Sequence, residues 1–233
     1  MSGKELSERV EGRVAAFLEE LARVPATAAP AARGRLIVAL DATASREPTW
    51  DRACEVQGQM FLEAGRLGGL EVQLVFYRGF HECKASRWVS DSRALVELMT
   101  RVRCKAGQTQ IRRVLRHAIA EARRQPVRAL VFIGDAVEEE LDELAALAAE
   151  LGILGVRVFL FHEGDDPRAE RAFREIARLT GGACCRFDRN APNELRELLG
   201  AVAAYAAAGP AVLEDLRRRP SAAVRLLARQ VRG

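Results

Sequence analysis

Residues 36–45 read Leu-Ile-Val-Ala-Leu-Asp-Ala-Thr-Ala-Ser. The first five residues of this stretch are apolar, which is typical of a strand buried on both faces of a parallel sheet. Three oxygen-bearing side chains follow at alternate positions, namely Asp41, Thr43 and Ser45. They can turn toward one point, and hard cations such as Mg²⁺ prefer oxygen ligands. The stretch therefore predicts a buried strand that ends in part of a small metal site.

Two later segments add oxygen donors to this set. Gly107-Gln108-Thr109 comes just before a stretch with the apolar spacing of an amphipathic helix. Residues 129–134 form a second apolar run, which ends at the carboxylate of Asp135. The sequence thus predicts five oxygen donors on three loops.

Strands and helices alternate along the rest of the chain. The apolar spacing predicts helices over 5–24, 48–67, 92–103, 109–124, 139–151, 168–179 and 193–207, and strands over 70–80, 82–89, 129–134, 156–162 and 183–187. The strands over 70–80 and 82–89 can pair as a hairpin. This pattern favours an α/β fold with a doubly wound, mostly parallel sheet, one antiparallel edge strand and helices on both faces. Ligands of such sheets bind at the carboxyl ends of strands where the strand order reverses.

The spaced set Asp41, Thr43, Ser45, Thr109 and Asp135 resembles the metal-ion-dependent adhesion site of the von Willebrand factor A (VWA) family, whose fold is Rossmann-like. The resemblance covers roughly residues 35–208. It implies that the three hydroxyls bind Mg²⁺ or Mn²⁺ and that the two aspartates act directly or through water. Thr43 stands where serine is more usual in the family. Gly134-Asp135-Ala136 replaces the usual Thr-Asp-Gly, which removes a hydroxyl and a glycine.

The resemblance implies a binding function rather than an enzymatic one. In such a site the ion keeps an open position, which an Asp or Glu side chain of a protein partner completes. Related proteins in bacterial cytoplasm often work beside AAA+ ATPases, so the resemblance suggests an adaptor role here. The alternative for Thr43, Ser45 and Thr109 is that they are turn and helix-cap residues.

A metal-dependent phosphohydrolase of the haloacid-dehalogenase type is the second functional hypothesis. It also places an aspartate after the first strand, here Asp41, and Gly164-Asp165-Asp166 could imitate its later acidic motif. Its second motif position is normally acidic, whereas this chain has Thr43. No lysine follows Asp135 to assist phosphoryl transfer. We therefore favour a binding module, with Asp165 and Asp166 in a loop before a helix that starts at Pro167.

Length and composition indicate the domain organisation and the classes of partner. The 233 residues predict one domain over 35–208, a helix and linker over 1–34, and a basic helical extension over 209–233. The net charge of +4 comes with only 6% aromatic residues, which does not favour nucleic-acid binding. We expect no membrane span and a cytoplasmic location, because long apolar runs and a secretory leader are lacking. The five cysteines lack the spacing of a zinc module or disulfide framework.

Overall fold

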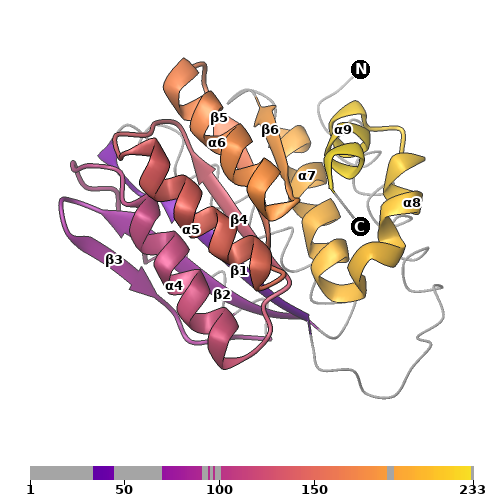
Figure 1. Ribbon diagram of the computed structural model, residues 1–233, viewed down its shortest axis with the longest axis horizontal. Helices are drawn as coiled ribbons and strands as arrows, with labels where there is room; N and C mark the ends of the chain where they lie inside the picture. Colours follow the sequence, from indigo (N-terminus) through magenta and orange to yellow (C-terminus); the bar gives the residue numbers. More distant parts are fainter. Residues whose placement is uncertain are drawn as a thin grey trace.

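A six-stranded sheet forms the centre of the molecule (Figure 1). It is seen in a computed structural model that describes residues 34–44, 70–90, 94, 97, 101–187 and 192–231. The strands are β1 (Gly34–Asp41), β2 (Leu70–Arg78), β3 (Glu82–Ala85), β4 (Ala129–Gly134), β5 (Arg157–Glu163) and β6 (Ala183–Phe187). Their order is β3-β2-β1-β4-β5-β6, and all neighbours are parallel except β2 with β3. The predicted mostly parallel sheet with one antiparallel edge strand is confirmed.

Helices cover both faces of this sheet. On one face, α4 (Ile111–Arg124), α5 (Leu141–Ile153) and α6 (Pro167–Thr180) lie side by side (Figure 1). On the other face lies α7 (Pro192–Ala208). Successive residues of a strand point to opposite faces, so Ile37 joins the core under the three helices and Val38 joins the core under α7. Burial on both faces explains why the first strand is apolar at consecutive positions.

The C-terminal residues pack into the same core as α7. They form η2 (Gly209–Val212), α8 (Leu213–Arg217) and α9 (Ala222–Gln230). Leu216 of α8 and Leu227 of α9 are fully buried there. The predicted helices over 5–24 and 48–67 lie outside the described residues. In the stretch 92–103, residues 94 and 97 are helical and 101–103 are not, and the rest lies outside the described residues. The predicted division at residues 34 and 208 stays a prediction.

One run in the described part of the chain, Asn193–Arg217, is long and apolar enough to cross a membrane by length and composition alone. Most of it, 61% of the most apolar window, is buried inside the molecule. This is the ordinary property of a core helix, and packing of α7 on the sheet accounts for its apolar composition.

The strand order reverses between β1 and β4. From β1 the chain proceeds to β2 on one side, whereas from β4 it proceeds to β5 on the other. In open α/β sheets such a reversal marks the place where ligands bind, beside the carboxyl ends of the strands. The two predicted aspartates, Asp41 and Asp135, lie at these two strand ends.

Candidate metal site

The two aspartates lie on adjacent strands and have unpaired oxygens. Leu40 of β1 pairs with Ile133 of β4, which places Asp41 beside Gly134 and next to Asp135. Asp41 is only 1% exposed, and its Oδ1 accepts a hydrogen bond of 2.8 Å from the backbone N–H of Thr43. Asp41 Oδ2 and Asp135 Oδ1 are buried without a hydrogen-bond partner among the described residues. Because buried polar atoms are nearly always satisfied, this pair of oxygens fits the donor set of a bound cation.

Electrostatics agree with a cation at this place. Burial raises the pKa of Asp41, and the negative charge of Asp135 raises it further. The hydroxyl and the backbone N–H of Thr43, together with the nearby Tyr77 hydroxyl, lower this pKa in part. The ionised carboxylate is therefore held at a cost in the folded protein, and a divalent cation would remove that cost.

Thr109 is tied to the loop that follows Asp135. Its hydroxyl donates a hydrogen bond of 2.9 Å to Glu139 Oε2 and accepts one of 3.0 Å from the backbone N–H of Glu138. Its own N–H donates to Glu138 Oε2 at 2.8 Å. A hydroxyl oxygen has two lone pairs, and only one of them is used here. Thr109 thus keeps one lone pair with which it could bind a metal ion.

Glycine contacts hold the Thr109 loop against the sheet. Lys105 N–H donates to the carbonyl of Ala42 at 3.0 Å, and Gln108 N–H donates to the carbonyl of Gly79 at 3.2 Å. Gly107 approaches Gly79 so closely that a Cβ atom on Gly107 would lie 2.0 Å from the Gly79 carbonyl oxygen. The Gly-x-Thr spacing of the sequence therefore has a physical cause. The glycine allows the contact that places Thr109 at the carboxyl edge of the sheet.

Structural similarity, and not sequence similarity, relates this chain to known proteins. No protein-family model matches this sequence, and no curated protein matches it significantly. A von Willebrand factor type A structure from Catenulispora acidiphila matches with a TM-score of 0.58 and 16% identity, over 73% of this chain and 43% of that one. The VWA domain of SpRpn10 matches with a TM-score of 0.53 and 10% identity, over 69% of this chain and 94% of that domain. This chain has the VWA fold.

A third VWA-fold match carries a metal. Proximal thread matrix protein 1 from the mussel byssus, in a structure with zinc in its MIDAS motif, matches with a TM-score of 0.59 and 14% identity. The match covers 75% of this chain and 46% of the mussel chain. The present chain thus spans less than half of the Catenulispora and mussel chains. A divalent metal site is compatible with this fold, and identities this low show the fold alone.

The structure places four of the five predicted ligands at one edge of the VWA fold. Asp41 and Thr43 come from the end of β1, Thr109 from the loop before α4, and Asp135 from the end of β4. Ser45 lies outside the described residues, so the full ligand set stays a prediction. No group of three or more His, Cys, Asp or Glu side chains arranged to hold a metal occurs in the described ranges. The predicted site does not require one, since it relies on hydroxyls beside two carboxylates.

The glycine that departs from the family pattern is required by its neighbour. A Cβ atom at position 134 would lie 2.7 Å from the ring of Phe132. That ring stacks on Tyr77, with 6.2 Å between ring centroids. Tyr77 is fully buried, and its hydroxyl has no hydrogen-bond partner of good geometry among the described residues. The space that a threonine would take in the VWA pattern is therefore filled by an aromatic ring.

Tyr77 is the site residue that sequence reasoning missed. It pairs in register with Asp41 across β1 and β2. Its pKa is raised well above the usual range by burial, and further by the charge of Asp41, so the phenol remains neutral. The available signal was its position near the carboxyl end of the strand beside β1, the edge where the aspartates were expected.

Asp166 has a structural role. Its side chain accepts a hydrogen bond of 2.8 Å from Arg168 N–H and caps the N-terminus of α6, which starts at Pro167. This confirms the interpretation of Asp165 and Asp166 as a loop before a helix. Asp166, one of the acidic residues that the phosphohydrolase hypothesis needs, therefore serves as a helix cap.

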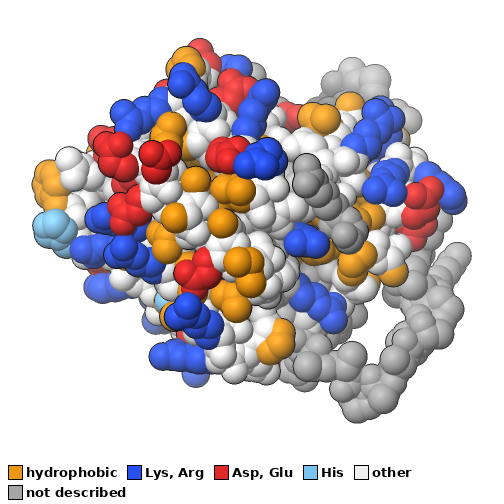
Figure 2. Space-filling view, viewed as in Figure 1, with side chains coloured by type: hydrophobic (Ala, Val, Ile, Leu, Met, Phe, Trp, Pro, Cys, Tyr) orange, Lys and Arg blue, Asp and Glu red, His pale blue; other side chains and the backbone are white. Residues whose placement is uncertain are grey.

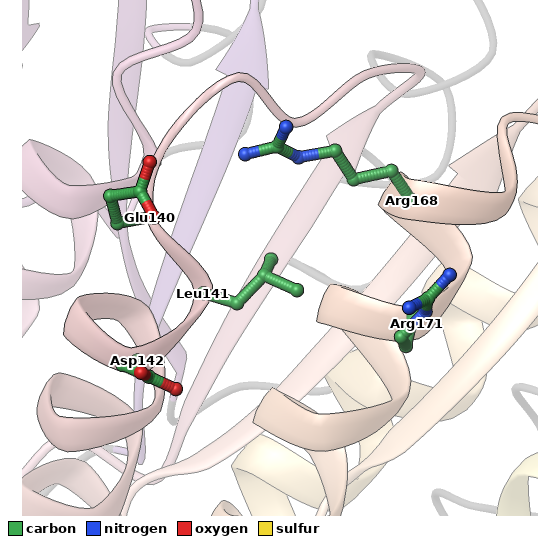
Figure 3. A pocket seen from close by; sticks show the side chains of 5 residues that line it. All are labelled: Glu140, Leu141, Asp142, Arg168 and Arg171. Atoms are coloured by element: carbon green, nitrogen blue, oxygen red, sulfur yellow. The ribbon is translucent and has the colours of Figure 1, made fainter.

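A hollow of about 380 Å³ borders the site between the N-terminal ends of α5 and α6 (Figure 3). It is lined by Glu140, Leu141, Asp142, Arg168 and Arg171. Arg168 also donates a hydrogen bond of 3.1 Å to the Glu139 carbonyl, which ties α6 to the loop that holds Thr109. The hollow is open and carries both signs of charge, so it does not form a second site for one kind of ion.

Proposed function

We propose that this chain is a protein-interaction module that depends on a divalent cation, Mg²⁺ or Mn²⁺. Asp41, Thr43, Ser45, Thr109 and Asp135 would hold the ion directly or through water. The ion would supply an electrophilic position that an Asp or Glu side chain of the partner completes. The observation that carries the proposal is the pair of buried, unpaired oxygens, Asp41 Oδ2 and Asp135 Oδ1, beside two hydroxyl-bearing residues.

The chemistry of the donors supports binding rather than turnover. Neutral hydroxyls leave more positive charge on a cation than carboxylates would, which favours an incoming carboxylate. Solved structures with the same fold include the human COPII-coat protein Sec24c, the VWA domain of SpRpn10 and proximal thread matrix protein 1 from the mussel byssus. An adaptor role beside an AAA+ ATPase belongs to the proposal and is supported by the sequence resemblance alone.

Binding of Mn²⁺, measured by the loss of its free electron paramagnetic resonance signal, tests the metal site. We expect the wild type to bind one Mn²⁺ and Asp135→Asn to lose this binding. Asp142→Asn is the matched control, because Asp142 is an exposed acid of the neighbouring helix that lies outside the proposed ligand set. Equal Mn²⁺ binding by the wild type and Asp135→Asn would refute the assigned site.

A pull-down tests the interaction itself. Proteins retained from lysate in the presence of Mg²⁺ should be released by chelator, and Asp135→Asn should retain none of them. Asp142→Asn should retain the same set as the wild type. Retention that survives both the chelator and Asp135→Asn would show that the interaction does not use the metal.

A further inference from the structure

An aromatic side chain stands in solvent at the edge of the sheet that carries the metal site. Phe80 lies in the turn between β2 and β3 and is 64% exposed. Figure 2 shows hydrophobic and histidine atoms together at the left end of the molecule, where Figure 1 shows this turn. In the described part of the chain, the other large exposed apolar side chains, Ile153, Leu154 and Leu226, lie at the end of α5 and on α9, away from this edge. Single exposed apolar side chains are normal on protein surfaces, so what distinguishes Phe80 is its place at the edge of the sheet that carries the metal site.

The turn that carries Phe80 is held firmly from behind. Gln110 Nε2 donates to the carbonyls of Arg78 and Gly79 at 3.2 and 3.1 Å, and Arg113 donates to the carbonyl of His81 at 2.6 Å. The carbonyls of two residues before Phe80 and one after it are therefore bonded to the start of α4. A side chain on a rigid backbone loses little entropy when a partner binds it, which is the property of a binding anchor.

Backbone hydrogen bonds connect this turn to the metal site. Gly79 N–H donates to the carbonyl of Lys105, whose own N–H donates to the carbonyl of Ala42, the residue after Asp41. Gln108, next to Thr109, donates to the carbonyl of Gly79. Phe80 thus directly follows Gly79, whose carbonyl accepts the hydrogen bond that helps to position Thr109. A protein segment that reaches the ion could also reach Phe80.

Charges differ on the two sides of the site. On the Phe80 side, Arg103 and Lys105 are exposed, and no ion pair within the described ranges includes either of them. On the other side, the exposed acids Glu138, Glu140 and Asp142 are accompanied by exposed Arg168 and Arg171, so the charge there is mixed. An acidic segment is therefore attracted more strongly to the first side.

We propose that Phe80 is the apolar anchor of the partner surface and that the partner is an acidic protein segment with a large apolar residue. The segment places a carboxylate on the ion and its apolar side chain on Phe80, with Lys105 adding attraction. This inference rests on the proposed metal-dependent function and adds the chemistry and the direction of approach of the partner.

A random nonapeptide library displayed on phage tests the inference. The full chain is immobilised with Mn²⁺, and bound phage are eluted with chelator. The wild type should select peptides with an Asp or Glu and a large apolar residue at fixed spacing. Phe80→Ser should select acidic peptides without the apolar preference. It should also bind a peptide selected on the wild type about 30-fold more weakly, the size of a binding hot spot.

Leu226→Ser is the matched control, because it also removes an exposed apolar side chain but lies on α9. It should select the same peptides as the wild type. The inference fails if Phe80→Ser keeps the apolar preference, or if the wild type selects acidic residues alone. If the wild type selects no peptides that chelator elutes, the proposed metal-dependent function fails and the inference fails with it.

Discussion

Gly107→Ala is the sharpest test of how the site is built. The new Cβ atom would lie 2.0 Å from the carbonyl oxygen of Gly79, whereas ordinary contact begins at 3.4 Å. The two segments must therefore separate by about 1.4 Å, because a backbone oxygen cannot rotate away as a side chain can. This shift breaks the hydrogen bonds that the Gly79 carbonyl accepts from Gln108 at 3.2 Å and from Gln110 at 3.1 Å.

The cost follows from these lost contacts. Each hydrogen bond contributes about 0.5–1.5 kcal/mol, and a buried acceptor left unpaired adds about 1–3 kcal/mol. We expect Gly107→Ala to lower the free energy of unfolding by about 2–6 kcal/mol. For a protein of this size that corresponds to a fall in Tm of about 4–24 °C. Displacement of Thr109 should also weaken Mn²⁺ binding by about 10-fold or more.

Thermal denaturation followed by circular dichroism, with and without Mn²⁺, measures both effects. Gly200→Ala is the matched control, because Gly200 lies inside α7 and a Cβ atom there meets no atom within 4 Å. This control should stabilise the protein by up to about 1 kcal/mol through helix propensity. A Tm for Gly107→Ala within about 2 °C of the wild type, with the same response to Mn²⁺, would refute the proposed packing of the loop.

Two further predictions concern a buried charge and an edge strand. At pH 7.5 without metal, Asp41→Asn should raise Tm by about 2–4 °C for each kcal/mol relieved, since the raised pKa of Asp41 means that its ionised form destabilises the fold. This gain in Tm should shrink as the pH falls through the raised pKa toward 3.8, and Mn²⁺ should stabilise only the wild type. A lower Tm for Asp41→Asn than for the wild type in chelator would contradict this prediction. Gln230→Leu should lower the free energy of unfolding by about 1–3 kcal/mol and promote aggregation, measured by light scattering. The reason is that the Gln230 side-chain amide forms hydrogen bonds with the N–H and the C=O of Cys184 on edge strand β6, at 3.0 and 3.1 Å. Arg229→Gln, a change at an exposed neighbour, should do neither, and equal aggregation of the two variants would count against a role in edge protection.

The surface on the two sides of the metal site differs in charge and in apolar character. Acidic side chains of the loop after β4 hold Thr109 from one side, and the turn of Gly79 holds its loop from the other. The side of this acidic loop carries charges of both signs, whereas the side of Phe80 and Lys105 offers an apolar ring and a positive charge. The same contacts that position a ligand therefore also favour one direction of approach for a partner.

Patterns in consecutive residues were sufficient to predict the sheet and the place of its two aspartates. Apolar runs over 36–40 and 129–134 mark strands buried on both faces, and the residues at their ends, Asp41 and Asp135, must lie at the carboxyl edge of a parallel sheet. These features are local, because strand periodicity and strand ends are written in consecutive residues. The strands over 129–134 and 183–187 have in the structure the bounds that the sequence predicted.

Contacts between distant segments of the chain could be identified only from the folded protein. The need for Gly134 comes from the ring of Phe132 stacked on Tyr77, and the partners of Thr109 are two glutamates about 30 residues away along the chain. Gln230 pairs with Cys184 across 46 residues. No local period encodes such pairs, because they depend on which strands become neighbours and on how far each loop reaches. The sequence named the donors, and packing set which of them face one another.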